Sequence, residues 1–170
     1  MVKLFNKYRE HGFSEFKGLR IDVTIPITEV VLNEAAQDIL GTRNENVQHV
    51  WISIRDQNTL NVDLRVRWGL LAKTFNFDAI VDEKIDFEVS PKLMISLSGS
   101  GLPLGILARI ADSIFGVLPE GVNIVGRIIE VNVSTMLSGR GLHDLIPLMK
   151  VAHIETISEK LILRLRIEVD

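Results

Sequence analysis

The chain has 170 residues, a formal net charge of −3 and no cysteine. The length fits one domain, the negative charge argues against a general nucleic-acid-binding role, and the lack of cysteine excludes disulfides, thiolate metal sites and cysteine nucleophiles within it. Aromatic residues make up only 6% of the chain, whereas isoleucine, valine and leucine are plentiful. An aliphatic, β-branched core favours sheet structure.

The first 19 residues form a basic arm, which we separate from a single domain over residues 20–170. Lysine and arginine outnumber acidic residues in the arm, and residues 3–9 mix cations with large apolar side chains, as interfacial segments do. The arm lacks the apolar stretch of a secretory signal, and no uncharged apolar window reaches 18 residues. We expect a cytoplasmic protein, or one peripheral to a membrane that it contacts through residues 1–20.

Alternating apolar and polar residues predict several strands. Residues 60–68 alternate strictly, which is typical of a strand with one buried and one solvated face. Turn-forming residues at 56–59 join this strand to residues 47–54, and residues 158–160 join 151–157 to 161–169, so we predict two antiparallel hairpins. Further strands are predicted over residues 23–26, 75–79, 85–89, 93–97 and 122–133.

Three helices are predicted. The first spans residues 29–40, with Thr28 as its N-cap and Gly41 as its C-terminal stop. The second covers the apolar residues 104–118. The third is short, over residues 134–137 and 142–149, and is interrupted by residues 139–141 and by Pro147. Together with the strands, these helices predict an α+β domain in which helices pack on one face of a large antiparallel sheet.

The predicted helix over residues 104–118 is apolar around most of its circumference. Arg109 and Asp112 fall in one polar stripe, and the remaining arc of roughly 200° is apolar, about twice what a helix lying on a sheet requires. The helix therefore needs apolar cover on two sides. The sheet covers one side, and we consider three covers for the other: the curled sheet itself, a bound lipid chain, or a homodimer seam.

The sequence carries no recognisable catalytic or metal-binding motif. Its four histidines are scattered without metal-site spacing, and no nucleophile elbow of the G-x-S-x-G type is present. The Gly-Ser-Gly turn at residues 99–101 lacks the lysine and hydroxyl residue of a phosphate-binding loop. We therefore predict a protein without catalytic activity, cofactor or metal ligands.

The order of the predicted elements has a counterpart in a known family. A strand ending at Pro26 precedes a helix with Asn33 near its middle, long meandering strands follow, and an apolar helix leads into the turn at residues 118–122. Over residues 20–169 this layout resembles the tubular lipid-binding superfamily, in particular its small single-domain bacterial members. The resemblance implies a strongly bent antiparallel sheet wrapped around the long apolar helix, with a second helix, a short third one, and acyl chains held between sheet and helices.

We therefore predict a non-enzymatic protein that binds or carries a lipid, such as a fatty-acyl ligand, or another elongated apolar ligand in a groove between sheet and helices. The alternative is a homodimeric protein-interaction or structural module without a ligand. The residues predicted to line the groove are Leu32, Ile39, Leu64, Val66, Trp68, Phe75, Phe77, Ile106, Ile110, Ile114 and Phe115.

Overall fold

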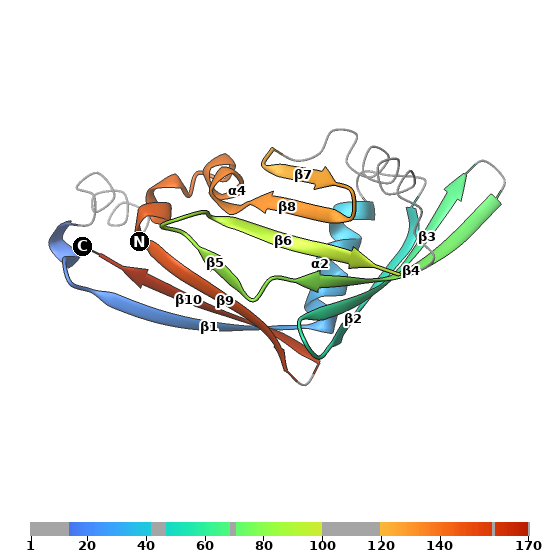
Figure 1. Cartoon of the computed structure of the whole chain (residues 1–170), viewed down its shortest axis with the longest axis horizontal. Helices are drawn as coiled ribbons and strands as arrows, with labels where there is room; N and C mark the ends of the chain where they lie inside the picture. The colour runs from blue at the N-terminus through green and yellow to red at the C-terminus, as the bar shows by residue number, and fades with distance from the viewer. Residues whose placement is uncertain (1–13, 42–46, 69–70, 100–119, 158, 170) are drawn as a thin grey trace.

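The computed structural model describes residues 14–41, 47–68, 71–99, 120–157 and 159–169 (Figure 1). These residues form two antiparallel sheets, one with strand order β1-β10-β9-β5 and one with strand order β2-β3-β4-β6-β8-β7. The strands are β1 (Arg20–Thr28), β2 (Val47–Arg55), β3 (Thr59–Trp68), β4 (Leu71–Val81), β5 (Lys84–Asp86), β6 (Lys92–Ser98), β7 (Val122–Val125), β8 (Ile128–Asn132), β9 (Met149–Ile157) and β10 (Lys160–Glu168). The helices are η1 (Ser14–Phe16), α2 (Glu29–Gly41), α4 (Val133–Gly139) and η2 (His143–Leu148).

The predicted α+β fold, with one large bent sheet wrapped around a long apolar helix, is wrong. The described part of the chain is mostly β, its strands divide into two sheets, and its longest helix, α2, has 13 residues. Residues 104–118, on which the long helix was predicted, lie outside the described residues. The prediction failed because a period of two shows which side chains share a face but not which strands pair with each other.

Several predictions of local structure are confirmed. The β2–β3 and β9–β10 hairpins are confirmed, and α2 begins as expected, with the Thr28 hydroxyl accepting a hydrogen bond from the Val31 N–H at 3.4 Å. The strand predicted over residues 85–89 is limited to β5, because the Asp86 carboxylate accepts hydrogen bonds from Glu88 N–H and Val89 N–H and turns the chain. The strand predicted over residues 122–133 is a hairpin, β7–β8.

The apolar core divides in the same way as the strands. One cluster lies on the six-stranded sheet and contains Val50, Leu64, Val66, Phe75, Ala79 and Leu97. A second cluster joins the end of β4 to β5 and β9 and contains Val81, Ile85, Ala152 and Ile154. The chain passes from one sheet to the other between β4 and β5, so the second cluster lies where the two sheets meet.

Asn58, in the turn between β2 and β3, holds the six-stranded sheet against β9. Its side-chain amide donates to the Ile154 carbonyl at 2.8 Å and its side-chain oxygen accepts from Thr156 N–H at 2.9 Å. Its own N–H donates to the Thr156 hydroxyl and its carbonyl accepts from Val81 N–H, both at 2.9 Å. Asn58 is 5% exposed, and its φ of 54° lies in the left-handed region, which asparagine tolerates better than most residues.

Asn33 of α2 covers the edge of β2 in a similar manner. Its side-chain oxygen accepts from Ile52 N–H at 2.7 Å and its amide donates to the Ile52 carbonyl at 2.8 Å. One turn earlier, the Glu29 carboxylate accepts from Ile54 N–H at 2.6 Å. Because β2 is an edge strand, these contacts satisfy backbone groups that would otherwise offer a template for pairing with another chain.

We expect Asn58→Ala to lower the free energy of unfolding by about 3 kcal/mol, since two buried backbone groups of β9 lose their partners and alanine is strained at positive φ. Asn58→Gly loses the same hydrogen bonds without the strain and is expected to be about 1 kcal/mol less destabilised. Urea denaturation measures both values. A loss below about 0.5 kcal/mol in Asn58→Ala would show that Asn58 does not hold the sheets together.

Asn33→Ala is expected to lower the free energy of unfolding by about 2 kcal/mol, because the Ile52 N–H and carbonyl lose their partners. Gln37→Ala, an exposed position one turn later on the same helix, serves as the control and should change stability by less than about 0.5 kcal/mol. Equal effects of the two substitutions in urea denaturation would contradict the proposed role of Asn33.

Candidate functional site

An aliphatic face runs along β1 and β10 on one side of the four-stranded sheet. The strands are antiparallel, and their register places four apolar pairs directly opposite each other: Ile21 with Ile167, Val23 with Leu165, Ile25 with Leu163, and Ile27 with Leu161. We call these eight residues the aliphatic face. In a strand, successive side chains point to opposite sides, so all eight lie on one side of the sheet and no polar residue interrupts them.

The aliphatic face is covered on its β10 side and open on its β1 side. Leu161, Leu163 and Leu165 pack against the second core cluster and are partly buried. On β1, by contrast, Ile21 is 41% exposed and Ile25 42%. None of the eight side chains is fully buried, so the face keeps part of its apolar surface accessible, above all at Ile21 and Ile25.

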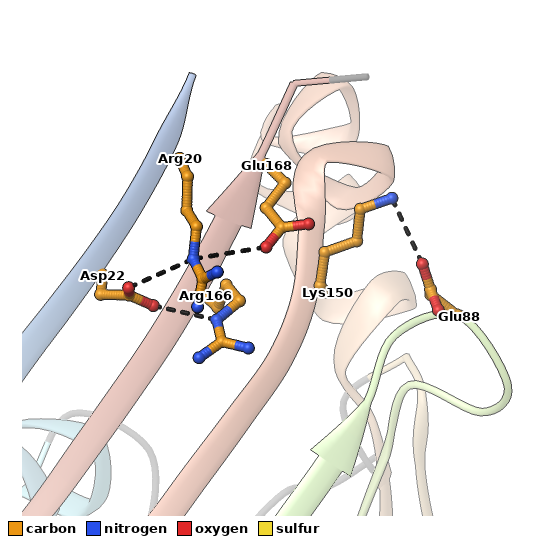
Figure 2. A network of polar contacts seen from close by, with 6 residues as sticks. All are labelled: Arg20, Asp22, Glu88, Lys150, Arg166 and Glu168. Carbon is orange, nitrogen blue, oxygen red and sulfur yellow. Dashed lines mark hydrogen bonds and ion pairs between the residues drawn. The ribbon is translucent and has the colours of Figure 1, made fainter. Parts of the chain in front are cut away.

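The other side of the same sheet is charged. Figure 2 shows Arg20 of β1 between two carboxylates, with its Nε 3.4 Å from Asp22 Oδ2 and 3.5 Å from Glu168 Oε1. Arg166, the register partner of Asp22, donates from Nε to Asp22 Oδ1 at 3.0 Å. A further ion pair joins Lys150 Nζ to Glu88 Oε1 at 3.2 Å. These pairs link β1 to β10 and β9 to the turn after β5.

Two carboxylates of this side have lowered pKa values. The hydrogen bond from Arg166 holds the pKa of Asp22 below its ordinary value of 3.8, and Arg20 acts in the same direction. The hydrogen bond from Lys84 likewise lowers the pKa of Asp86, and the backbone N–H groups of Val89 and Glu88 contribute. Asp22 is therefore held in its charged form mainly by Arg166 of the neighbouring strand β10, and Asp86 by groups of its own strand and the turn after it.

A groove of about 420 Å³ crosses the four-stranded sheet. Five of its nine lining residues have charged or titratable side chains, and these come from all four strands of the sheet. The lining residues are Asp22, Val23, Thr24, Lys84, Val151, His153, Arg164, Leu165 and Arg166.

The residues predicted to line a ligand groove are not brought together as one open surface. Leu64, Val66 and Phe75 are buried in the first core cluster, and Phe77 packs against that cluster. Leu32 of α2 is partly buried. The positions of Ile106, Ile110, Ile114 and Phe115, and the side chains of Ile39 and Trp68, lie outside the described residues. Contact of this set with a ligand stays a prediction.

The sequence contained a signal for the aliphatic face that the prediction did not use. Ile21, Val23, Ile25 and Ile27 alternate with polar residues and Pro26, and the leucines of residues 161–165 alternate with Ile162 and Arg164. The groove was harder to find, because Lys84 comes near His153 and Arg164 only through the pairing of β5 with β9, which are distant in the sequence.

Within the described residues, no group of three or more histidine, aspartate or glutamate side chains is placed to hold a metal ion. No helix in that part of the chain has the length and apolarity needed to cross a membrane. No family model, curated protein or solved structure matches the chain. The resemblance to tubular lipid-binding proteins accordingly stays a prediction.

The lowered pKa of Asp22 predicts how stability depends on pH. A carboxyl group whose pKa is lower in the folded than in the unfolded state stabilises the fold above its unfolded pKa, and this contribution is lost as the pH falls through the folded pKa. As the pH falls from about 5 to about 2, the Asp22→Asn variant should therefore lose less free energy of unfolding than the wild type. Arg166→Gln, which removes the first cause of the shift, should reduce the pH dependence similarly. If the wild type and both variants lose the same free energy of unfolding across this pH range in urea denaturation, the role given to Asp22 is wrong.

Proposed function

We propose that the chain is a non-enzymatic protein that binds or carries an elongated apolar molecule, such as the acyl chain of a lipid, along the aliphatic face. The observation that supports the proposal is the unbroken run of four apolar register pairs, none of whose side chains is fully buried. Four pairs span about 20 Å at a rise of about 3.4 Å per residue. A long, narrow apolar surface suits an extended chain.

The width of the aliphatic face favours a lipid chain over a second protein. Neighbouring strands lie about 4.8 Å apart, so a face two strands wide and about 20 Å long presents on the order of 200 Å². A stable protein interface buries about 800 Å² on each partner. A homodimer would therefore need a contact surface several times larger than this face.

The affinity of such a site would come from buried methylene groups. Each one contributes about 0.8 kcal/mol, and a dissociation constant of 1 μM corresponds to about 8 kcal/mol. On the order of ten buried methylenes would provide this much, with more required to offset the entropy lost on association. A long acyl chain contains enough of them, whereas a short-chain acid does not.

Native mass spectrometry after mild purification should show co-purified lipid, and saturating fatty acid or phospholipid should raise the melting temperature by about 5–10 °C. Ile25→Glu places a charge on the aliphatic face and should abolish both effects. Ile157→Glu is the matched control, because Ile157 is 47% exposed and lies on the charged side of the same sheet.

Three outcomes would contradict this proposal. One is a wild-type protein that carries no lipid and shows no thermal shift with any fatty acid or phospholipid. Another is equal lipid binding by Ile25→Glu and Ile157→Glu. The third is a lipid-free dimer whose light-scattering mass does not depend on concentration, which would favour the homodimeric module instead.

A further inference from the structure

Three basic side chains lie in one row across the charged side of the four-stranded sheet. The register places Arg164 of β10 opposite His153 of β9, and His153 opposite Lys84 of β5. All three are exposed and line the groove. Arg166 follows two residues after Arg164, so its side chain lies on the same side of the sheet and also lines the groove.

The residues that line the groove include three cations, Lys84, Arg164 and Arg166, and one carboxylate, that of Asp22. Asp22 pairs with Arg166 at 3.0 Å.

The carboxylates that neutralise two of these cations lie outside the groove lining. Glu155 forms an ion pair with Arg164, and Asp86 forms one with Lys84 at 3.2 Å. Glu155 lies two residues from His153 on the side away from Val151, whereas Asp86 is the register partner of Val151. A guanidinium group has five N–H donors, so Arg164 and Arg166 keep donors for a further acceptor while each is paired with one carboxylate.

We propose that this groove binds a phosphate group. Two guanidinium groups, two residues apart on one strand and on the same side of the sheet, offer forked donors that match the oxygens of a phosphate, and each such charge-assisted pair is stronger than a neutral hydrogen bond. Lys84 and His153 supply further donors from the neighbouring strands. The volume of about 420 Å³ exceeds that of the anion alone, so the phosphate belongs to a larger molecule, either a soluble phosphate ester or a lipid head group.

The site does not depend on the proposed function. Val23 and Leu165 line the groove and also belong to the aliphatic face, but the other groove residues lie on the opposite side of the strands from that face. An apolar chain on one side therefore does not place its own head group beside the groove cations. Loss of lipid carriage in Ile25→Glu would leave the phosphate site intact, and loss of the phosphate site would leave lipid carriage intact.

The first experiment titrates the whole chain with inorganic phosphate at constant ionic strength and follows the backbone amide signals by NMR. We expect saturable shifts centred on residues 22–24, 151–153 and 164–166. Arg164→Gln should weaken binding at least about tenfold, because a charge-assisted pair is lost. Arg65→Gln, an exposed arginine on a central strand of the other sheet, is the control and should bind like the wild type.

A second variant separates binding from a purely structural role of the ion pairs. Glu155→Gln removes the carboxylate that competes for Arg164, so it should strengthen phosphate binding even where it lowers stability. If Arg164→Gln fails to fold, His153→Gln replaces it and should also weaken binding. The proposal would be overturned if the wild type showed no saturable shifts. It would also be overturned if Glu155→Gln and the groove variants all bound phosphate with the affinity of the wild type.

A sedimentation assay distinguishes the two sources of the phosphate. The phosphate belongs to a lipid head group if the protein binds phosphatidylcholine vesicles that contain phosphatidic acid but not vesicles of phosphatidylcholine alone. This binding should then be lost in Arg164→Gln. Phosphate binding in the NMR titration without vesicle binding would assign a soluble phosphate ester. Failure in both assays overturns the proposal.

Discussion

The arrangement of the two sheets depends on the side-chain amide of Asn58. A carboxamide offers N–H donors and a carbonyl acceptor, and Asn58 uses one N–H on the Ile154 carbonyl and its oxygen on the Thr156 N–H of β9. β5 pairs with β9 at residues 151–153, and the Glu83 carbonyl accepts from the Ile154 N–H at 2.8 Å. Asn58 bonds the next backbone groups of β9, and so the six-stranded sheet is held against the four-stranded one.

Asn33 shows the same principle at the edge of β2. Both asparagines are almost fully buried, and each satisfies backbone groups that a buried strand edge cannot leave unpaired without a cost of about 1–3 kcal/mol per group. Side-chain hydrogen bonds of this kind hold neighbouring sheets and helices together without a continuous apolar core between them. The outcome is two small core clusters and an aliphatic face on β1 and β10 that the rest of the described chain leaves partly uncovered.

The sequence was sufficient for local structure and insufficient for the division into sheets. Turn residues and alternation predicted the β2–β3 and β9–β10 hairpins, because both signals act over a few residues. The pairing of β1 with β10, by contrast, joins the two ends of the described chain, and no local pattern reveals it. Leu64, Val66 and Phe75 show a second limit. An apolar face on a strand is equally consistent with a packed core and with the lining of a ligand groove, and three-dimensional contacts are needed to distinguish them.

The two sides of the four-stranded sheet are linked through the register of β10. Its leucines belong to the aliphatic face and its arginines to the groove. A slip of one residue would exchange the two sets, placing guanidinium groups against the core and leucines in the groove. The ion pair between Asp22 and Arg166 joins direct register partners, so a slip would break it as well. The charged contacts along the groove therefore specify which side of the sheet is apolar. An exposed ion pair contributes little to stability, so the pair of Asp22 and Arg166 acts mainly by selecting the register of the strands.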